Sequence, residues 1–104
     1  VDYPSAEREL AIVKSRVPNI NAKLSQQVVG FVQALRDQDL FKVPGVAETI
    51  DWATALTELD ARSLTPQVVG DTLGALLKYQ DDIGRMQGPA LDKIIKEAVS
   101  DPAA

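Results

Sequence analysis

Apolar residues recur at intervals of three and four along nearly the whole 104-residue chain, which is typical of helices with one buried face. No stretch alternates apolar and polar residues with period two, and neither Asn-Gly nor Asp-Gly, the strongest hairpin signals, occurs. A chain of this length forms one domain and buries roughly 65% of its unfolded surface, enough for one core. The sequence therefore predicts an all-α bundle of four to six helices over residues 1–99, with a flexible tail at 100–104.

Capping residues and prolines divide the first part of this pattern into two helices. Ser5 is placed to cap the first helix, and Pro18 ends it because proline cannot donate to the helical ladder. Asn21 caps the second, which ends near Arg36, a cation suited to the negative end of the helix dipole. The residues predicted to face the core are Ala6, Leu10, Val13 and Val17 in the first helix, and Leu24, Val28, Phe31, Val32 and Leu35 in the second.

The remainder of the chain predicts a packed loop and three more helices. Leu40 and Phe41 suggest that the irregular stretch 37–45 packs onto the bundle. A third helix is predicted over 46–59, with Trp52 off its inward stripe and covering a helix junction. The other inward residues predicted are Ile50, Ala53 and Leu56; then Val69, Leu73, Leu76, Gln80 and Ile83 of a fourth helix that Thr65 caps; and Leu91, Ile94, Ile95 and Ala98 of a last short helix.

The composition excludes several kinds of chemistry. The chain has no cysteine, so thiolate nucleophiles, disulfides and cysteine-based zinc sites are excluded, and it has no histidine. No glycine is followed by lysine, so there is no phosphate-binding P-loop. Asp81-Asp82 is the densest carboxylate pair, but neighbouring helical side chains point about 100° apart, which indicates a polar helix face rather than an acid–base dyad. The chain alone is predicted to have no catalytic residues and no metal site.

The charge balance narrows the classes of partner. Fifteen acidic and eleven basic residues give a net charge of −4, which repels a nucleic-acid backbone. No apolar run approaches the roughly 20 residues of a membrane helix. Residues 46–104 hold ten acidic and five basic groups, which could face a basic partner, although a solvated face is the default interpretation. The start at Val1-Asp2, without methionine or a signal segment, suggests a fragment of a longer protein or a processed product.

Residues 43–56, Val-Pro-Gly-Val-Ala-Glu-Thr-Ile-Asp-Trp-Ala-x-Ala-Leu, resemble the C-terminal lid of MoxR-like AAA+ ATPases, a branch that includes proteins associated with carbon-monoxide dehydrogenase maturation. Three further stretches resemble such lids in the same order: Tyr-Pro followed by Glu-x-x-Ile-Val-x-x-Arg-x-Pro within 3–18, Phe-Val-x-x-Leu-Arg at 31–36, and Asp-Thr-Leu-Gly-x-Leu-Leu-Lys-Tyr-x-Asp-Asp-Ile at 71–83. The similarity covers roughly residues 2–84.

The resemblance implies a lid that closes over ATP and magnesium held in an upstream core, which carries the P-loop, the second acidic motif and the arginine finger. Such proteins would be cytoplasmic and assemble with neighbouring subunits into a ring, expected to be hexameric. The ring would hydrolyse ATP to remodel or mature client proteins, including metalloenzymes, with adaptors that carry a von Willebrand A domain. It implies no nucleic-acid or membrane partner, and an ATPase activity that belongs to the parent protein alone.

The resemblance also implies nucleotide contacts at the start of the third helix, Gly45-Val46-Ala47-Glu48-Thr49. A helix N-terminus suits phosphates because its free N–H groups attract anions. Many AAA+ lids place a sensing arginine there, whereas this chain has Glu48 and Thr49. Either Thr49 and the backbone suffice, or Glu48 orients a neighbour's cation, or the lid senses nucleotide weakly; equally, Glu48 only caps its helix.

Ile12 would line the adenine pocket by the same resemblance, while Val13 lies on the inward stripe and is predicted core. A different class of function remains open, a free-standing acidic helical module that binds other proteins. That module predicts a uniformly polar surface, whereas a lid without its core would expose an apolar face from residues such as Ile12, Leu40 and Phe41. A stand-alone enzyme that uses only Asp or Glu is disfavoured.

Overall fold

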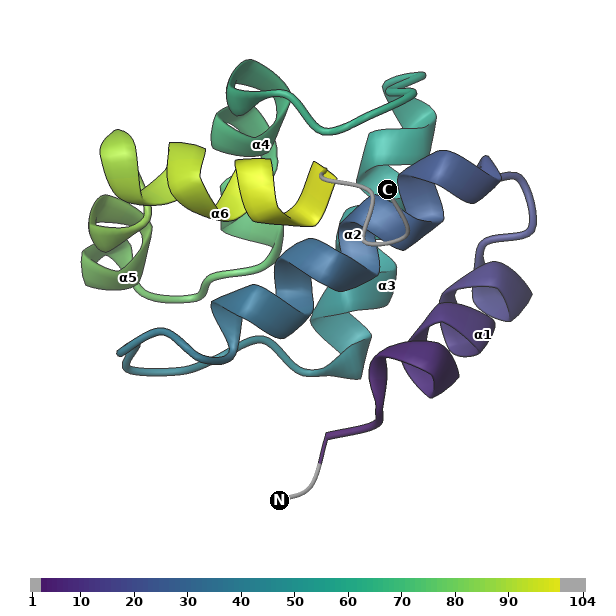
Figure 1. Ribbon diagram of the computed structural model, residues 1–104, viewed down its shortest axis with the longest axis horizontal. Coiled ribbons are helices and arrows are strands. Elements are labelled where there is room, and N and C mark those ends of the chain that lie inside the picture. The colour runs from purple at the N-terminus through teal and green to yellow at the C-terminus, as the bar shows by residue number, and fades with distance from the viewer. Residues whose placement is uncertain (1–2, 100–104) are drawn as a thin grey trace.

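The structure, a computed structural model, describes residues 3–99 (Figure 1). In this range the chain is all-helical, which confirms the predicted all-α bundle, and it contains no strand. The predicted tail at 100–104 lies outside the described residues. The elements are α1 (Ala6–Arg16), α2 (Ala22–Leu35), α3 (Val46–Glu58), α4 (Pro66–Thr72), the 3₁₀ turn η1 (Leu73–Ala75), α5 (Gln80–Arg85) and α6 (Pro89–Val99).

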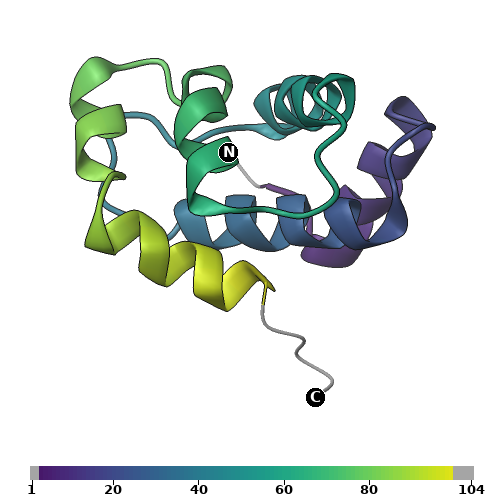
Figure 2. The same cartoon turned by 90° about the horizontal axis from the view of Figure 1, so that it is seen from above.

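Helix α2 is the centre of the bundle. It packs against α1 and α3 and most extensively against α6, which lies alongside it (Figure 2). Its N-terminal half also anchors the segment before α4, because Gln27 Oε1 accepts a hydrogen bond from Leu64 N at 2.7 Å. Six of its apolar side chains are buried in the core: Leu24, Val28, Val29, Phe31, Val32 and Leu35.

Three helix starts follow the predicted capping chemistry. The Ser5 hydroxyl accepts from Arg8 N at 3.2 Å, the Asn21 side chain from Leu24 N at 2.7 Å, and the Thr65 hydroxyl from Val68 N at 3.2 Å. Each cap satisfies one of the N–H groups that a helix start leaves without an internal partner. The predicted starts of α1, α2 and α4 are therefore confirmed.

The predicted fourth helix is wrong beyond Thr72. The chain passes through η1, becomes extended at Tyr79, and starts a separate helix, α5. Gly74 weakens a continuous helix, and the Thr72 hydroxyl donates back to Val68 O at 2.7 Å, a bond that bends helices. The break lets Leu76 and Leu77 both enter the core, and it leaves Gln80, predicted inward, exposed.

Trp52 lies at a helix junction, as predicted, but the prediction that it lies off the inward stripe of the third helix is wrong, because Trp52 is fully buried. Its ring centroid is 5.2 Å from that of Phe31 on α2, and its Nε1 donates to Thr72 Oγ1 of α4 at 2.7 Å. Trp52 therefore joins α2, α3 and α4. Ile50, predicted to face inward, is only half-buried, because the core side of α3 is centred on Thr49, Trp52, Ala53 and Leu56.

Candidate functional site

The start of α3 is closed by its own side chain. Gly45 is the N-cap, and its N–H donates to Glu48 Oε1 at 2.8 Å. This bond confirms the interpretation of Glu48 as a helix cap. Ala47 is exposed, while Gly45, Val46 and Glu48 are half-buried, so this helix start is accessible only in part. The capping carboxylate also places a negative charge where an anion would approach.

Thr49, the last of the predicted nucleotide contacts on α3, is fully buried. Its Oγ1 lies 3.0 Å from Glu9 Oε2 of α1 and 3.0 Å from the carbonyl oxygen of Gly45. The structure thus brings the first helix and the start of the third together through one buried hydrogen bond. The Thr49 hydroxyl is engaged inside the protein and faces no open surface.

The hydrogen bond between α1 and α3 belongs to a larger buried cluster, which we call the Glu9 hub. It consists of Glu9, Gln33, Arg36 and Thr49. Arg36 donates through Nη1 to Glu9 Oε1 at 2.8 Å and through Nη2 to Glu9 Oε2 at 2.7 Å, a bidentate pair. Gln33 Nε2 also donates to Glu9 Oε1, at 2.8 Å. The carboxylate therefore accepts four hydrogen bonds, counting that of Thr49, which satisfies a buried charge.

Arg36 extends the hub to the segments that flank it. Its Nε donates to Pro44 O at 2.8 Å, just before α3, and its guanidinium carbon lies 4.5 Å from the centre of the Tyr3 ring. The sequence predicts for Arg36 only a favourable interaction with the dipole of α2, and it does not predict the buried pair with Glu9. The available signal was that Glu9 and Val13 are four residues apart and so share the inward side of α1. Ala6, predicted to face inward, is exposed.

Ile12 lies three residues after Glu9, at the boundary between the buried and the exposed sides of α1. It is half-buried, and together with Arg8, Ala11, Ser15 and Arg16 it lines a shallow surface depression. We call these five residues the arginine face. The structure therefore brings α1 to the start of α3 through Glu9, whereas Ile12 lies next to Glu9 at the edge of the exposed side and lines the depression.

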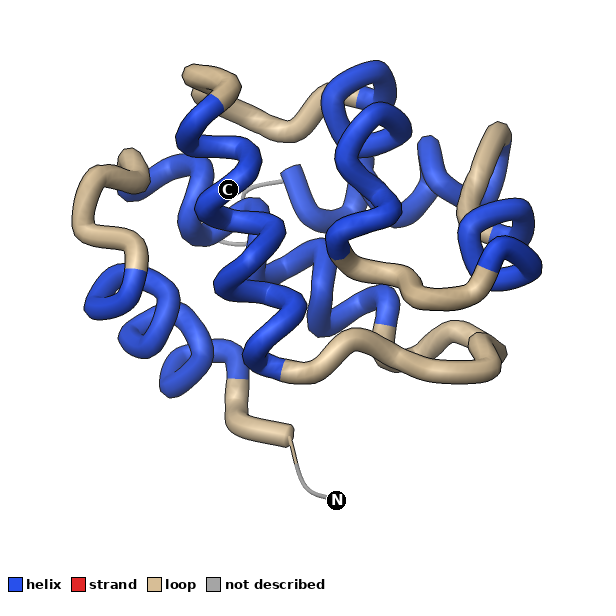
Figure 3. The backbone as a smooth tube through the Cα atoms, turned by 180° about the vertical axis from the view of Figure 1, so that it is seen from behind, coloured by secondary structure: helices blue, strands red, loops and turns tan. Residues whose placement is uncertain are grey.

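Phe41 and Tyr79 form an exposed aromatic pair. Their side chains are 69% and 53% exposed, and their ring centroids are 6.1 Å apart. The predicted packing of the loop 37–45 onto the bundle is therefore wrong for Phe41, while Leu40 is half-buried against the core. In the view from behind, this loop runs along the edge of the molecule toward α5 (Figure 3).

Asp82 holds that loop in place. Its carboxylate is fully buried and accepts from Phe41 N at 2.8 Å and from Lys42 N at 3.1 Å. The interpretation of Asp81-Asp82 as a polar helix face is right for Asp81, which is exposed, and wrong for Asp82. The physical reason is that a turn without regular backbone pairing needs an acceptor for its N–H groups. Arg85 adds a second tie, because its Nη1 donates to Asp39 O at 2.8 Å.

Residues 3–99 contain no group of three or more carboxylates placed to hold a metal ion. Within the same range, no helix combines the length and the apolar character needed to cross a bilayer. Comparison of the chain with models of known families, with curated proteins and with solved structures finds no match.

Proposed function

We propose that this chain is the C-terminal lid of a MoxR-like AAA+ ATPase. It closes over ATP and magnesium held by an upstream core and relays the nucleotide state through a ring, hexameric by resemblance, of neighbouring subunits. The parent protein is cytoplasmic and uses ATP hydrolysis to remodel or mature a client, with or without a von Willebrand A domain adaptor. The lid supplies packing surfaces and movement, while the catalytic residues belong to the core.

The exposed aromatic pair is the observation that carries this proposal. A free-standing polar module needs no such surface, whereas a lid packs an apolar face against its core. Phe41 is exposed although Asp82, a buried carboxylate, fixes the backbone on which it sits. A fixed and exposed aromatic side chain is the usual anchor of a protein interface, because little conformational entropy is lost when it is covered.

The contact between α1 and the start of α3 gives further support to the lid function. The two stretches that resemble nucleotide-facing parts of a lid are joined through Glu9 and Thr49. Because Glu48 caps its own helix and Thr49 is buried, the proposal assigns phosphate contact to the backbone N–H groups of Val46 and Ala47. It assigns the sensing cation to a neighbouring subunit.

The test uses the complete reading frame that encodes this chain. The proposal expects a P-loop sequence upstream and ATP hydrolysis by the purified full-length protein. Phe41→Ser with Tyr79→Ser should lower that hydrolysis, while Leu59→Ser, at another exposed apolar side chain (60% exposed), should leave it unchanged. A reading frame without a P-loop, or a full-length protein that neither binds nor hydrolyses ATP, would overturn the proposal.

The second candidate is the free-standing acidic helical module. It is favoured by the start of α3, where Glu48 Oε1 and Thr49 Oγ1 both form internal hydrogen bonds. A reading frame that begins at Val1 would support this module.

A further inference from the structure

The arginine face is part of the side of α1 that the bundle leaves uncovered, a side on which Glu7 and Lys14 are also exposed. Its members are spaced by three and four residues, so they form a continuous stripe along the outside of the helix. Figures 1 and 3 show α1 at the edge of the molecule, with its outer side turned away from the other helices.

The charges on this stripe are unbalanced. Arg8 and Arg16 are both exposed, and neither side chain has a hydrogen bond or ion pair with the part of the chain that the structure describes. No carboxylate lines the depression. Two acidic residues flank Arg8 in sequence: Glu9 points into the core and pairs with Arg36, whereas Glu7 is exposed but does not line the depression. In a protein with a net charge of −4, the charged residues that line the depression around Ile12 are thus both cations.

The stripe is held rigidly. The Glu9 hub fixes α1 to α2 and α3 from the inner side, with the Glu9–Arg36 pair at 2.7 Å and Thr49 at 3.0 Å. The outer side chains therefore stand on a backbone that does not have to be ordered when a partner binds. The two ends of the stripe carry arginine rather than lysine, and arginine favours bidentate pairing with carboxylates.

We infer that the arginine face docks an acidic helix of another protein, which carries carboxylate, apolar and carboxylate side chains at four-residue intervals. Arg8, Ile12 and Arg16 have this spacing, and the two arginines stand about 12 Å apart along the helix axis. A helix laid alongside α1 places its own side chains at the same interval. Its carboxylates then pair with the arginines, and its apolar residue covers Ile12.

A second copy of this chain does not satisfy that pattern. No two acidic residues in the sequence are eight positions apart, so no single helix of the chain carries the complementary stripe. The occupant is therefore a different protein. This inference requires neither a nucleotide nor an upstream core, and it assigns to Ile12 a contact with the docked helix in place of the adenine contact that the resemblance implies.

The test is an NMR titration of the full 104-residue chain with an alanine-rich helical peptide of about 20 residues that carries Glu, Leu and Glu at four-residue intervals. A second peptide has the same composition, with the three residues moved to different sides of the helix. We expect chemical-shift changes centred on residues 8–16, at least roughly threefold weaker binding of the rearranged peptide, and weaker binding at higher salt.

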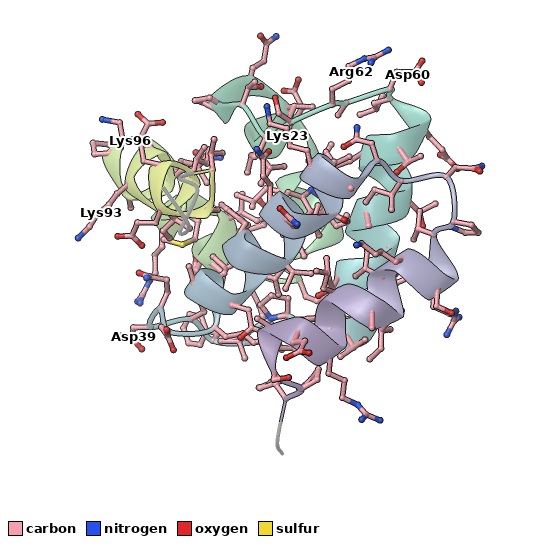
Figure 4. All side chains as sticks on the ribbon, turned by 45° about the vertical axis from the view of Figure 1, so that its right-hand side comes forward. Lys23, Asp39, Asp60, Arg62, Lys93 and Lys96 are labelled. Carbon is pink, nitrogen blue, oxygen red and sulfur yellow. The ribbon has the colours of Figure 1, made fainter. Side chains whose placement is uncertain are left out.

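Arg8→Gln with Arg16→Gln should weaken the binding of the patterned peptide by roughly tenfold, because both charge pairs are lost. Ile12→Ser should weaken the binding of the same peptide without changing how that binding depends on salt. The matched control is Lys78→Gln with Lys93→Gln, which removes the same charge elsewhere; Lys93 projects from α6, on the opposite side of the molecule from α1 (Figure 4). Lys14→Gln controls for a cation on α1 outside the depression.

Equal binding of the two peptides, shifts outside α1, or no shifts at all would overturn the inference. Shifts at Ile12 on addition of ATP, with none from the patterned peptide, would overturn it as well and would assign the face to a nucleotide. Failure here leaves the ATPase test of the proposed function unaffected, because that test is made on the full reading frame. Circular dichroism of each variant verifies that the helices remain folded.

Discussion

Arg36 Nη2 lies 2.7 Å from Glu9 Oε2, and both side chains are buried, at 7% and 0% exposure. This pair links the C-terminal end of α2 to α1 and, through Thr49 and Pro44, to the start of α3. Three segments that are far apart in sequence therefore share one charged contact. The position of the α3 start depends on it.

Replacing Arg36 with Met should destabilise the fold by about 3–5 kcal/mol, because Glu9 would remain buried without its counter-charge. The measurement is the free energy of unfolding in urea. Glu9→Leu combined with Arg36→Met should cost less than the sum of the two single changes, since the double variant leaves no unpaired buried charge. A cost below about 1 kcal/mol for Arg36→Met would show that water reaches Glu9 and that the pair is exposed in solution.

Asp82 and its neighbour Asp81 offer a matched comparison. Asp82→Ala removes the acceptor of Phe41 N and Lys42 N and should destabilise the protein by about 1–3 kcal/mol. Hydrogen exchange at the Phe41 and Lys42 amides should speed up more than exchange in α2. Asp81→Ala, at an exposed side chain, should change the stability by less than about 0.5 kcal/mol. Equal effects of the two changes would contradict the anchoring role of Asp82.

The sequence predicts the helices and most of the apolar core, because both follow from local spacing and caps. Val13, Val28, Phe31, Leu35 and Leu56 are all buried as predicted. Ser5, Asn21 and Thr65 cap because each needs only the residue three positions on. Such features are local, so a single sequence contains them.

The polar contacts could not be predicted in this way, because they join distant segments. Glu9 and Arg36 are 27 residues apart, and Phe41 and Asp82 are 41 residues apart. Nothing in the local pattern distinguishes Asp82, which is buried, from Asp81, which is exposed. The nucleotide contacts proposed for Ile12 and the start of α3 stay a prediction, since they came from resemblance and no match among known proteins bears on them.

Trp52 gives the protein a single fluorescent reporter in the core. Thr72→Val removes the acceptor of the Trp52 Nε1–H, and this should cost about 1–3 kcal/mol because the donor stays buried without a partner. The tryptophan emission of the folded protein should also change, since the hydrogen bond to its indole is lost. Thr54→Val is the control, because the Thr54 hydroxyl is exposed and bonds only within α3. An unchanged stability for Thr72→Val would mean that water replaces the lost acceptor.

The aromatic pair should govern self-association of the isolated chain. Phe41→Ser with Tyr79→Ser removes two exposed rings, so it should lower any concentration-dependent increase in mass measured by analytical ultracentrifugation. The stability should change by less than about 1 kcal/mol, because neither side chain is in the core. Leu59→Ser serves as the control at a separate exposed apolar side chain. If Leu59→Ser lowers the self-association and the double variant does not, the chain does not self-associate through the aromatic pair.

Replacing Gly70 and Gly88 with alanine should change the stability of the protein in opposite directions. Gly70 lies inside α4 with no atom near the position of an added methyl group, so Gly70→Ala should stabilise the protein by about 0.5–1 kcal/mol. Gly88, just before α6, has a φ of +69°, where a side chain is strained, so Gly88→Ala should destabilise it by about 1–2 kcal/mol. Because 1 kcal/mol shifts the melting temperature of a domain this size by about 4–8 °C, thermal unfolding resolves both signs. A stabilising Gly88→Ala would mean that the turn into α6 adopts a different backbone in solution.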